Sequence, residues 1–394
     1  MTHPHATSHA PLSHSQPFRG LARAIRFTIG RFLLMPVGAV IALIWANTAA
    51  ESYFQFAYRL SFFVNEIAMA LFFALLAQEV YEATMPGGAL HSWRKWTMPV
   101  VAAAGGIAGA VSVYLLFIQS QYEPGLSSAW PIACAVDAVL TFYLLKAIMP
   151  RSAALPFALL LAIVTDIVGL LIVAPRYVVM ETRVGGAALA IGALLAAAFM
   201  RARKVHTFWP YLLICGTAMW VAFYWEGLHP AFALVPLIPF LPHEARTVDV
   251  FVDPRDDDAV HHAEHEWHLA VQPVVFLFAL VNAGVILRGY DTATWGMLLA
   301  SLVGRPLGML VAVGLALAAG LHLPRQIGWR ELLVIAFATA SGFSIALFFA
   351  TGLLATGPVL GSAKIGVIAS ACAALLALGT AWALKVGRFV VSRH

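Results

Sequence analysis

Three charged side chains interrupt runs of about twenty mostly apolar residues, and they are the residues most suited to chemistry in this sequence. They are Asp137, Asp166 and Arg305. An ionisable group costs several kcal/mol in a span of this kind, so its presence predicts a function. Two carboxylates against one guanidinium leave one net negative charge, which suits a site for a small cation.

Each of these residues also has a purely structural interpretation. Asp137 suits the cap of a broken helix, because the positive end of a half-helix favours a carboxylate. Asp166 suits a fixed ion pair with Arg305. Arg305 keeps its proton inside proteins, so it holds charge but does not carry a proton. The sequence leaves both interpretations open for all three residues.

The composition indicates the elements that must position these residues. The chain has 394 residues, of which 61% are hydrophobic and 11% charged, and its mean hydropathy is +0.84. A transmembrane helix needs about 20 apolar residues. We therefore expect an all-α polytopic membrane protein with about twelve spans. They are expected near 32–50, 58–85, 96–119, 129–149, 155–175, 184–200, 207–225, 227–242, 270–287, 293–319, 330–354 and 361–385.

Two of these spans contain signals for a break in the helix. Pro131 stands six residues before Asp137 in the fourth span, and Ala340-Ser-Gly-Phe-Ser344 interrupts the eleventh with small polar residues. Interrupted spans in corresponding positions of two halves indicate a transporter's binding site.

The basic residues predict the topology. If the N-terminus is cytoplasmic, most of the 24 lysines and arginines fall on the cytoplasmic side, which favours both termini inside. Such residues contact anionic membrane lipid, and nucleic-acid binding is not expected. We expect a disordered cytoplasmic tail at 1–31, a transporter domain at 32–387 and a short cytoplasmic tail at 388–394.

Several further residues suit a response to pH, because histidine changes charge near neutrality. A cytoplasmic loop at 243–268 is rich in carboxylates and histidines. It suits a pH sensor or, equally simply, a solvated acidic surface. The candidates for pH sensing are Glu79, Glu82, His229, Glu264, His265 and His268.

Two remaining patterns concern assembly and catalysis. Gly105 and Gly109 form a GxxxG motif, which suits helix packing within the chain or a homodimer face. In a chain with 30 glycines, packing within the chain is favoured. The spans contain no HExxH or GxSxG motif, so neither an enzyme nor a cofactor is expected.

The ordered set of motifs resembles the NhaA family of bacterial sodium/proton antiporters. The similar stretches are Asn65–Met85, Trp130–Asp137, Ala162–Gly169, Glu264–His268, Ala279–Val285, Gly304–Gly308 and Gly342–Ser344. The resemblance implies twelve helices with an inverted repeat in the bacterial inner membrane. It also implies that two unwound helices, spans 4 and 11, cross at mid-membrane.

The chain departs from the family pattern at the residues that carry the chemistry. Thr165 stands where the family has the first of two aspartates, Val136 where it has threonine, and Arg305 where it has lysine. Glu79-Val-Tyr-Glu82-Ala replaces the family's Glu-Val-Lys-Arg-Glu run. The resemblance therefore predicts the fold more firmly than the ion selectivity or stoichiometry.

These observations together predict a monovalent cation (Na⁺ or Li⁺)/proton antiporter. Asp166 is expected to be the carrier and a transient ligand for Na⁺, with oxygen donors from Thr165 and from freed backbone carbonyls near Asp137. One carrier carboxylate predicts electroneutral exchange. The alternative is a relative of the same fold that has lost sodium exchange and moves another small solute or acts as a sensor.

Overall fold

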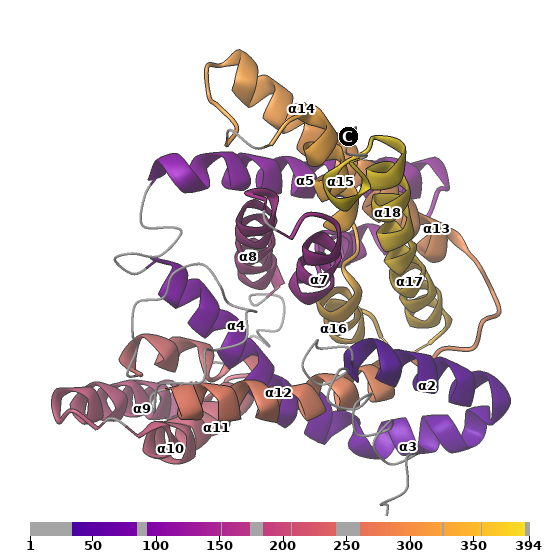
Figure 1. Cartoon of the computed structure of the whole chain (residues 1–394). Helices are drawn as coiled ribbons and strands as arrows, with labels where there is room; N and C mark the ends of the chain where they lie inside the picture. The colour runs from indigo at the N-terminus through magenta and orange to yellow at the C-terminus, as the bar shows by residue number, and fades with distance from the viewer. Residues whose placement is uncertain are drawn as a thin grey trace, which may run out of the picture.

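The computed structural model describes residues 34–84, 93–150, 152–173, 184–205, 207–241, 261–324, 327–355 and 357–390. Within these ranges every regular element is a helix. The predicted tail at 1–31 and most of the acidic loop lie outside the described residues. In Figure 1, α7, α8 and α16 lie between α5 above them and α12 and α2 below.

The α-helices account for most of the described chain. In order they are α2 (Leu34–Thr48), α3 (Ala50–Phe62), α4 (Met69–Thr84), α5 (Trp93–Ser120), α6 (Trp130–Ala133), α7 (Ala138–Ile148), α8 (Ala154–Val173), α9 (Val184–Ala202), α10 (Phe208–Pro210), α11 (Thr217–Trp225), α12 (His261–Asn282), α13 (Thr292–Leu299), α14 (Arg305–Ala318), α15 (Trp329–Ala338), α16 (Phe343–Leu353), α17 (Pro358–Ala369) and α18 (Ala373–Ala383).

Shorter helical segments of other types join them. The π-helical segments are η1 (Phe63–Ala68), η4 (Tyr211–Gly216) and η7 (Ala300–Gly304), and the 3₁₀ segments are η2 (Pro124–Ala129), η5 (Pro230–Phe232), η6 (Val235–Phe240), η8 (Ser370–Cys372) and η9 (Gly387–Phe389). A π-helical turn inside a longer helix often marks a functional position. Here η1 contains Glu66, and η7 ends directly before Arg305.

Six helices of the described chain are long and apolar enough to cross a membrane, and two bent pairs raise the number to eight. Shorter apolar helices occur as well. These lengths fit a hydrocarbon core of about 30 Å. The fold is all-α, whereas the total of twelve spans and the inverted repeat stay predictions.

Each bent pair stands at one of the two interruptions in the sequence. The segment Pro124–Ala133 meets α7 at 51°, and α15 meets α16 at 43°. Pro131 near the start of α6 and Gly342 at the start of α16 are the local residues that disfavour a continuous helix.

Four glycines bring α5 against η7 and α14 at backbone contact. A Cβ atom on Gly109 would lie 2.2 Å from the carbonyl oxygen of Gly304, and one on Gly105 would lie 2.5 Å from that of Gly308. The GxxxG motif therefore packs within the chain. This close packing places Arg305, the first residue of α14, beside α5.

One expected span and one expected loop boundary differ from the structure. Residues 227–242 were expected to form a span, but the structure has the short 3₁₀ helices η5 and η6 there. Pro230, Pro236 and Pro239 explain the difference, since proline lacks the N–H group that an α-helix needs. The expected loop at 243–268 also ends early, because α12 begins at His261.

Candidate functional site

Asp137 joins the two bent helix pairs. Its carboxylate caps α7 by accepting from the backbone N–H of Leu140 at 2.9 Å, and its second oxygen accepts from the N–H of Ser344 in α16 at 3.2 Å. Its own N–H donates to the carbonyl of Ser341 at 2.8 Å. The side chain is 1% exposed. One carboxylate thus neutralises the positive ends of two half-helices, as the capping interpretation requires.

The guanidinium of Arg305 lies at the C-terminal end of α6, where the helix dipole is negative. Its Nη2 donates to the carbonyls of Ala133 at 3.2 Å and Ala135 at 3.1 Å, and also to that of Cys134. These carbonyls lie where α6 ends and have no further turn of helix to bond. The sequence predicted that freed carbonyls near Asp137 would bind the transported cation, but in the structure this guanidinium binds them.

The two chain segments at the breaks touch each other. A Cβ atom on Gly342 would lie 2.4 Å from the carbonyl oxygen of Ala135, so only glycine fits between them. The hydroxyl of Thr141 in α7 donates to the carbonyl of Ala338 in α15 at 3.1 Å. Asp137 therefore binds both non-helical segments, whereas Arg305 binds the one in the fourth span.

Thr165 and Asp166 lie side by side in α8, and each is 1% exposed. The Thr165 hydroxyl donates its proton to the carbonyl of Leu161 at 2.9 Å, which leaves its oxygen lone pairs free to accept. Asp166 lies near enough to Arg305 for the two charges to interact. The structure thus brings together the residues that the sequence selected from three different spans.

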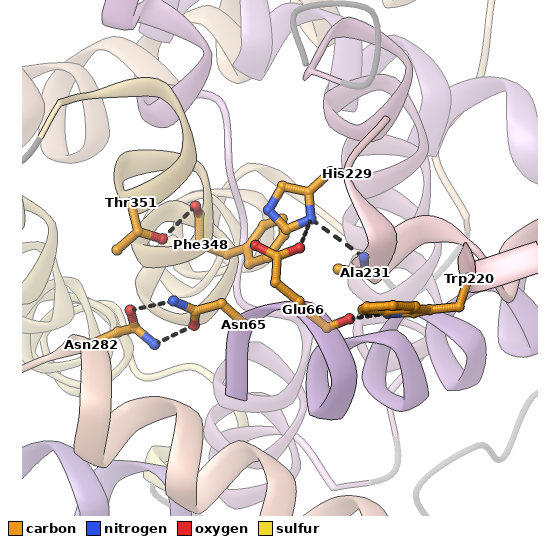
Figure 2. A network of polar contacts seen from close by, with 8 residues as sticks. All are labelled: Asn65, Glu66, Trp220, His229, Ala231, Asn282, Phe348 and Thr351. Atoms are coloured by element: carbon orange, nitrogen blue, oxygen red, sulfur yellow. Dashed lines mark hydrogen bonds and ion pairs between the residues drawn. The ribbon is translucent and has the colours of Figure 1, made fainter. Parts of the chain in front are cut away.

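A second polar cluster lies at the π-helical segment η1 (Figure 2). Oε2 of Glu66 lies 3.2 Å from Nδ1 of His229, and the indole N–H of Trp220 donates to the Glu66 carbonyl at 2.8 Å. The neighbouring Asn65 and Asn282 exchange amide hydrogen bonds of 3.4 and 2.8 Å. This cluster ties the long helix α3–η1–α4 to α12 and to the turn after α11.

The contact between Glu66 and His229 needs a proton. Nδ1 of His229 also accepts from the N–H of Ala231 at 3.3 Å, so it carries a lone pair in that arrangement. An ionised carboxylate opposite that lone pair would place two acceptors 3.2 Å apart. A proton on the Glu66 carboxyl removes the repulsion and keeps the Ala231 hydrogen bond, which makes the cluster sensitive to pH.

Comparison with known proteins identifies the family. A sequence model of the family described as Na⁺/H⁺ antiporter 1 matches residues 24–382. The chain belongs to this family. It is 36% identical over 354 residues to the Na⁺/H⁺ antiporter NhaA of Desulfitobacterium hafniense, a match that covers 86% of this chain and 91% of the relative. Its identity to the NhaA of Geobacter metallireducens is 35% over 363 residues, covering 89% of this chain and 95% of the relative.

A solved structure shares the fold of this family member. It is the sodium proton antiporter MjNhaP1 of Methanocaldococcus jannaschii, with a TM-score of 0.55 and 15% sequence identity, covering 94% of this chain and 98% of that one. The predicted NhaA resemblance is thus confirmed, and with it a multi-pass membrane protein of an antiporter family. The named relatives are transporters rather than enzymes.

The pH-sensing candidates of this Na⁺/H⁺ antiporter 1 family member are only partly described. Glu79 and Glu82 lie in α4, and Glu264, His265 and His268 lie at the start of α12, but their side chains lie outside the described part. Within the described residues, His229 contacts Glu66 rather than its neighbour in sequence, Glu226. The Glu226 carboxylate instead accepts from the N–H of Ala187 in the first turn of α9 at 2.9 Å.

Sequence reasoning missed the partnership of Glu66 with His229. A carboxylate within the apolar span 58–85 was the available signal, since such residues are rare in membranes. Its partner, 163 positions along the chain, gave no local signal.

Proposed function

We propose that this protein exchanges Na⁺ or Li⁺ for H⁺ across the bacterial inner membrane, with both termini in the cytoplasm and Asp166 as the carrier. The observation that carries the proposal is the different use of the two buried aspartates. The carboxylate of Asp137 is committed to two helix ends, whereas Asp166 is buried in α8 directly after Thr165, whose hydroxyl oxygen keeps lone pairs that can accept. Asp166 is therefore the group suited to alternate between a proton and a cation.

The same difference supports electroneutral exchange. Thr165 does not ionise and Arg305 keeps its proton. If Asp166 alone titrates, it holds either one Na⁺ or one H⁺, and the carrier crosses the membrane with the same charge in both directions. Asp137 contributes by holding the two half-helices together, and by its negative charge near the cation path.

The direct experiment is exchange by purified protein in liposomes that contain a pH-sensitive dye. Addition of Na⁺ or Li⁺ should move protons in the opposite direction, and K⁺ serves as the comparison ion. Asp166→Asn liposomes form the control, because an amide cannot alternate between a proton and a cation. Equal proton movement in control and wild-type liposomes would contradict the proposal.

Regulation by pH forms part of the proposal. His229, in contact with Glu66, is the candidate whose geometry is described. Glu79, Glu82, Glu264, His265 and His268 are proposed as the cytoplasmic contributors. We also propose that the basic cytoplasmic residues contact anionic lipid and that the protein can form a homodimer.

A second candidate function follows from Arg305. Its Nε and Nη1 atoms are buried and make no hydrogen bond within the described structure. Two guanidinium nitrogens whose N–H groups have no acceptor suit an anionic ligand. Under this second hypothesis the protein has lost sodium exchange and moves or senses another small solute. In a thermal-shift assay, dialysed protein would then respond to a small anionic solute and not to Na⁺ or Li⁺.

A further inference from the structure

Ser341 has a hydroxyl that the fold leaves without a partner. It lies between α15 and α16 and is 1% exposed, and its Oγ has no hydrogen-bond partner within the described structure. Its backbone carbonyl accepts from the N–H of Asp137 at 2.8 Å. A buried polar atom without a partner is unfavourable and uncommon, so it calls for a physical explanation.

Three other buried hydroxyls of the described chain have hydrogen-bond partners. Thr339, two residues earlier, donates to the carbonyl of Ile335 at 3.0 Å, and Thr141 donates to Ala338 at 3.1 Å. Ser370 in η8 donates to the carbonyl of Val367 at 2.6 Å. The unpartnered hydroxyl is thus a property of Ser341 and not of buried hydroxyls in this chain as a group.

A cation near Asp166 needs oxygen donors that the fourth span does not supply. The carbonyls of Ala133, Cys134 and Ala135 face the guanidinium of Arg305, which repels a second cation. The Asp137 carboxylate accepts from two helix N-termini. The segment that packs against Ala135 at Gly342 also contains Ser341, whose hydroxyl oxygen is used by no other group of the described structure and can supply a donor.

We propose that the Ser341 hydroxyl is a ligand of the transported cation, together with Asp166 and Thr165. The inference rests on the proposed function and adds a residue of the eleventh span to its site. A hydroxyl oxygen is a hard ligand of the kind that Na⁺ and Li⁺ prefer. Cation binding would give the buried Ser341 Oγ the partner that it lacks. Because Ser341 joins two half-helices, its ligand bond links cation binding to the geometry of the broken span.

The test is Ser341→Ala, measured by the half-saturating Na⁺ concentration and by the Na⁺-dependent shift in melting temperature. We expect the half-saturating concentration to rise about tenfold, the factor that corresponds to 1.4 kcal/mol. Without Na⁺ the variant should melt at the wild-type temperature or above it, because an unsatisfied hydroxyl has been removed. A structural role would produce the opposite pattern, with lower ion-free stability and unchanged ion affinity.

Two further variants complete the experiment. Ser341→Cys keeps the approximate size of the side chain but replaces the hard oxygen with a soft sulfur, so it should weaken Na⁺ binding as Ser341→Ala does. It serves in place of Ser341→Ala if the alanine variant does not fold. Ser370→Ala removes a satisfied hydroxyl elsewhere and should leave the Na⁺ response unchanged. A wild-type Na⁺ response in both Ser341 variants overturns this inference alone. Absence of Na⁺ and Li⁺ responses in the wild-type protein overturns the proposed function and this inference with it.

Discussion

Asp137→Asn should destabilise the protein more than the loss of an ordinary helix cap. The carboxylate accepts from Leu140 N–H and Ser344 N–H on separate oxygens, whereas an amide offers one oxygen and turns an NH₂ group toward the other donor. An unsatisfied buried N–H costs about 1–3 kcal/mol. Loss of charge opposite two helix ends adds about 0.3–1 kcal/mol for each. The expected loss is about 2–5 kcal/mol.

The assay is thermal melting of purified protein in detergent, with Asp291→Asn as the matched variant. Asp291 caps α13 by accepting from Ala293 N–H at 3.1 Å, and its other oxygen accepts from the Ser362 hydroxyl at 2.6 Å, but it is exposed and caps no second helix. Asparagine is nearly as good a cap there, and the Ser362 hydroxyl can donate to the Pro358 carbonyl at 3.1 Å instead, so the change should cost less than Asp137→Asn, about 1 kcal/mol or below. Equal melting temperatures for the two variants would refute the double-cap argument. Transport by Asp137→Asn should fall together with its stability.

Three other substitutions test separate parts of the account. Asp166→Asn should abolish exchange in liposomes while the protein stays folded; ion-dependent transport above a small fraction of the wild-type rate would exclude Asp166 as the carrier. Glu66→Gln places a permanent N–H donor opposite His229 and should alter the pH profile of transport without changing the ion carried. An unchanged profile would contradict the conclusion that the contact between Glu66 and His229 needs a proton. Gly109→Val, whose Cβ would meet a backbone oxygen at 2.2 Å, should prevent folding as judged by size-exclusion chromatography, whereas Gly192→Ala in open space should be neutral.

The acidic loop gives an independent test of pH regulation. Deletion of about residues 249–262 should shift the activity profile along the pH axis and leave ion preference unchanged, if the loop histidines sense cytoplasmic pH. Transport measured in inverted membrane vesicles over a pH series checks this. An unchanged profile would favour a solvated acidic surface.

The sequence predicted the two places where helices are interrupted. Apolar length predicted spans, and Pro131 and the Ser341-Gly342 pair predicted where helices end, because both effects act on neighbouring backbone. For Asp137 the sequence left capping and ion binding both open, and the structure shows the cap. These predictions depend on a few adjacent residues, where elementary sterics and hydrogen bonding decide the outcome.

Contacts between distant segments could not be predicted in the same way. Arg305 binds carbonyls 170 to 172 residues earlier, and only the packed fold shows that these carbonyls are occupied. The partnership of Glu66 with His229 has the same origin. The expected span at 227–242 was wrong because apolar composition was weighted above three prolines.

The central claim is that Asp166 alone exchanges its proton, and the potential dependence of transport tests it most directly. Exchange is measured in liposomes whose membrane potential is clamped at different values with valinomycin and K⁺. The one-carboxylate account predicts that rate and end-point follow the pH and Na⁺ gradients and are the same at every potential. A rate or end-point that changes with the potential would contradict it and would require a second proton carrier.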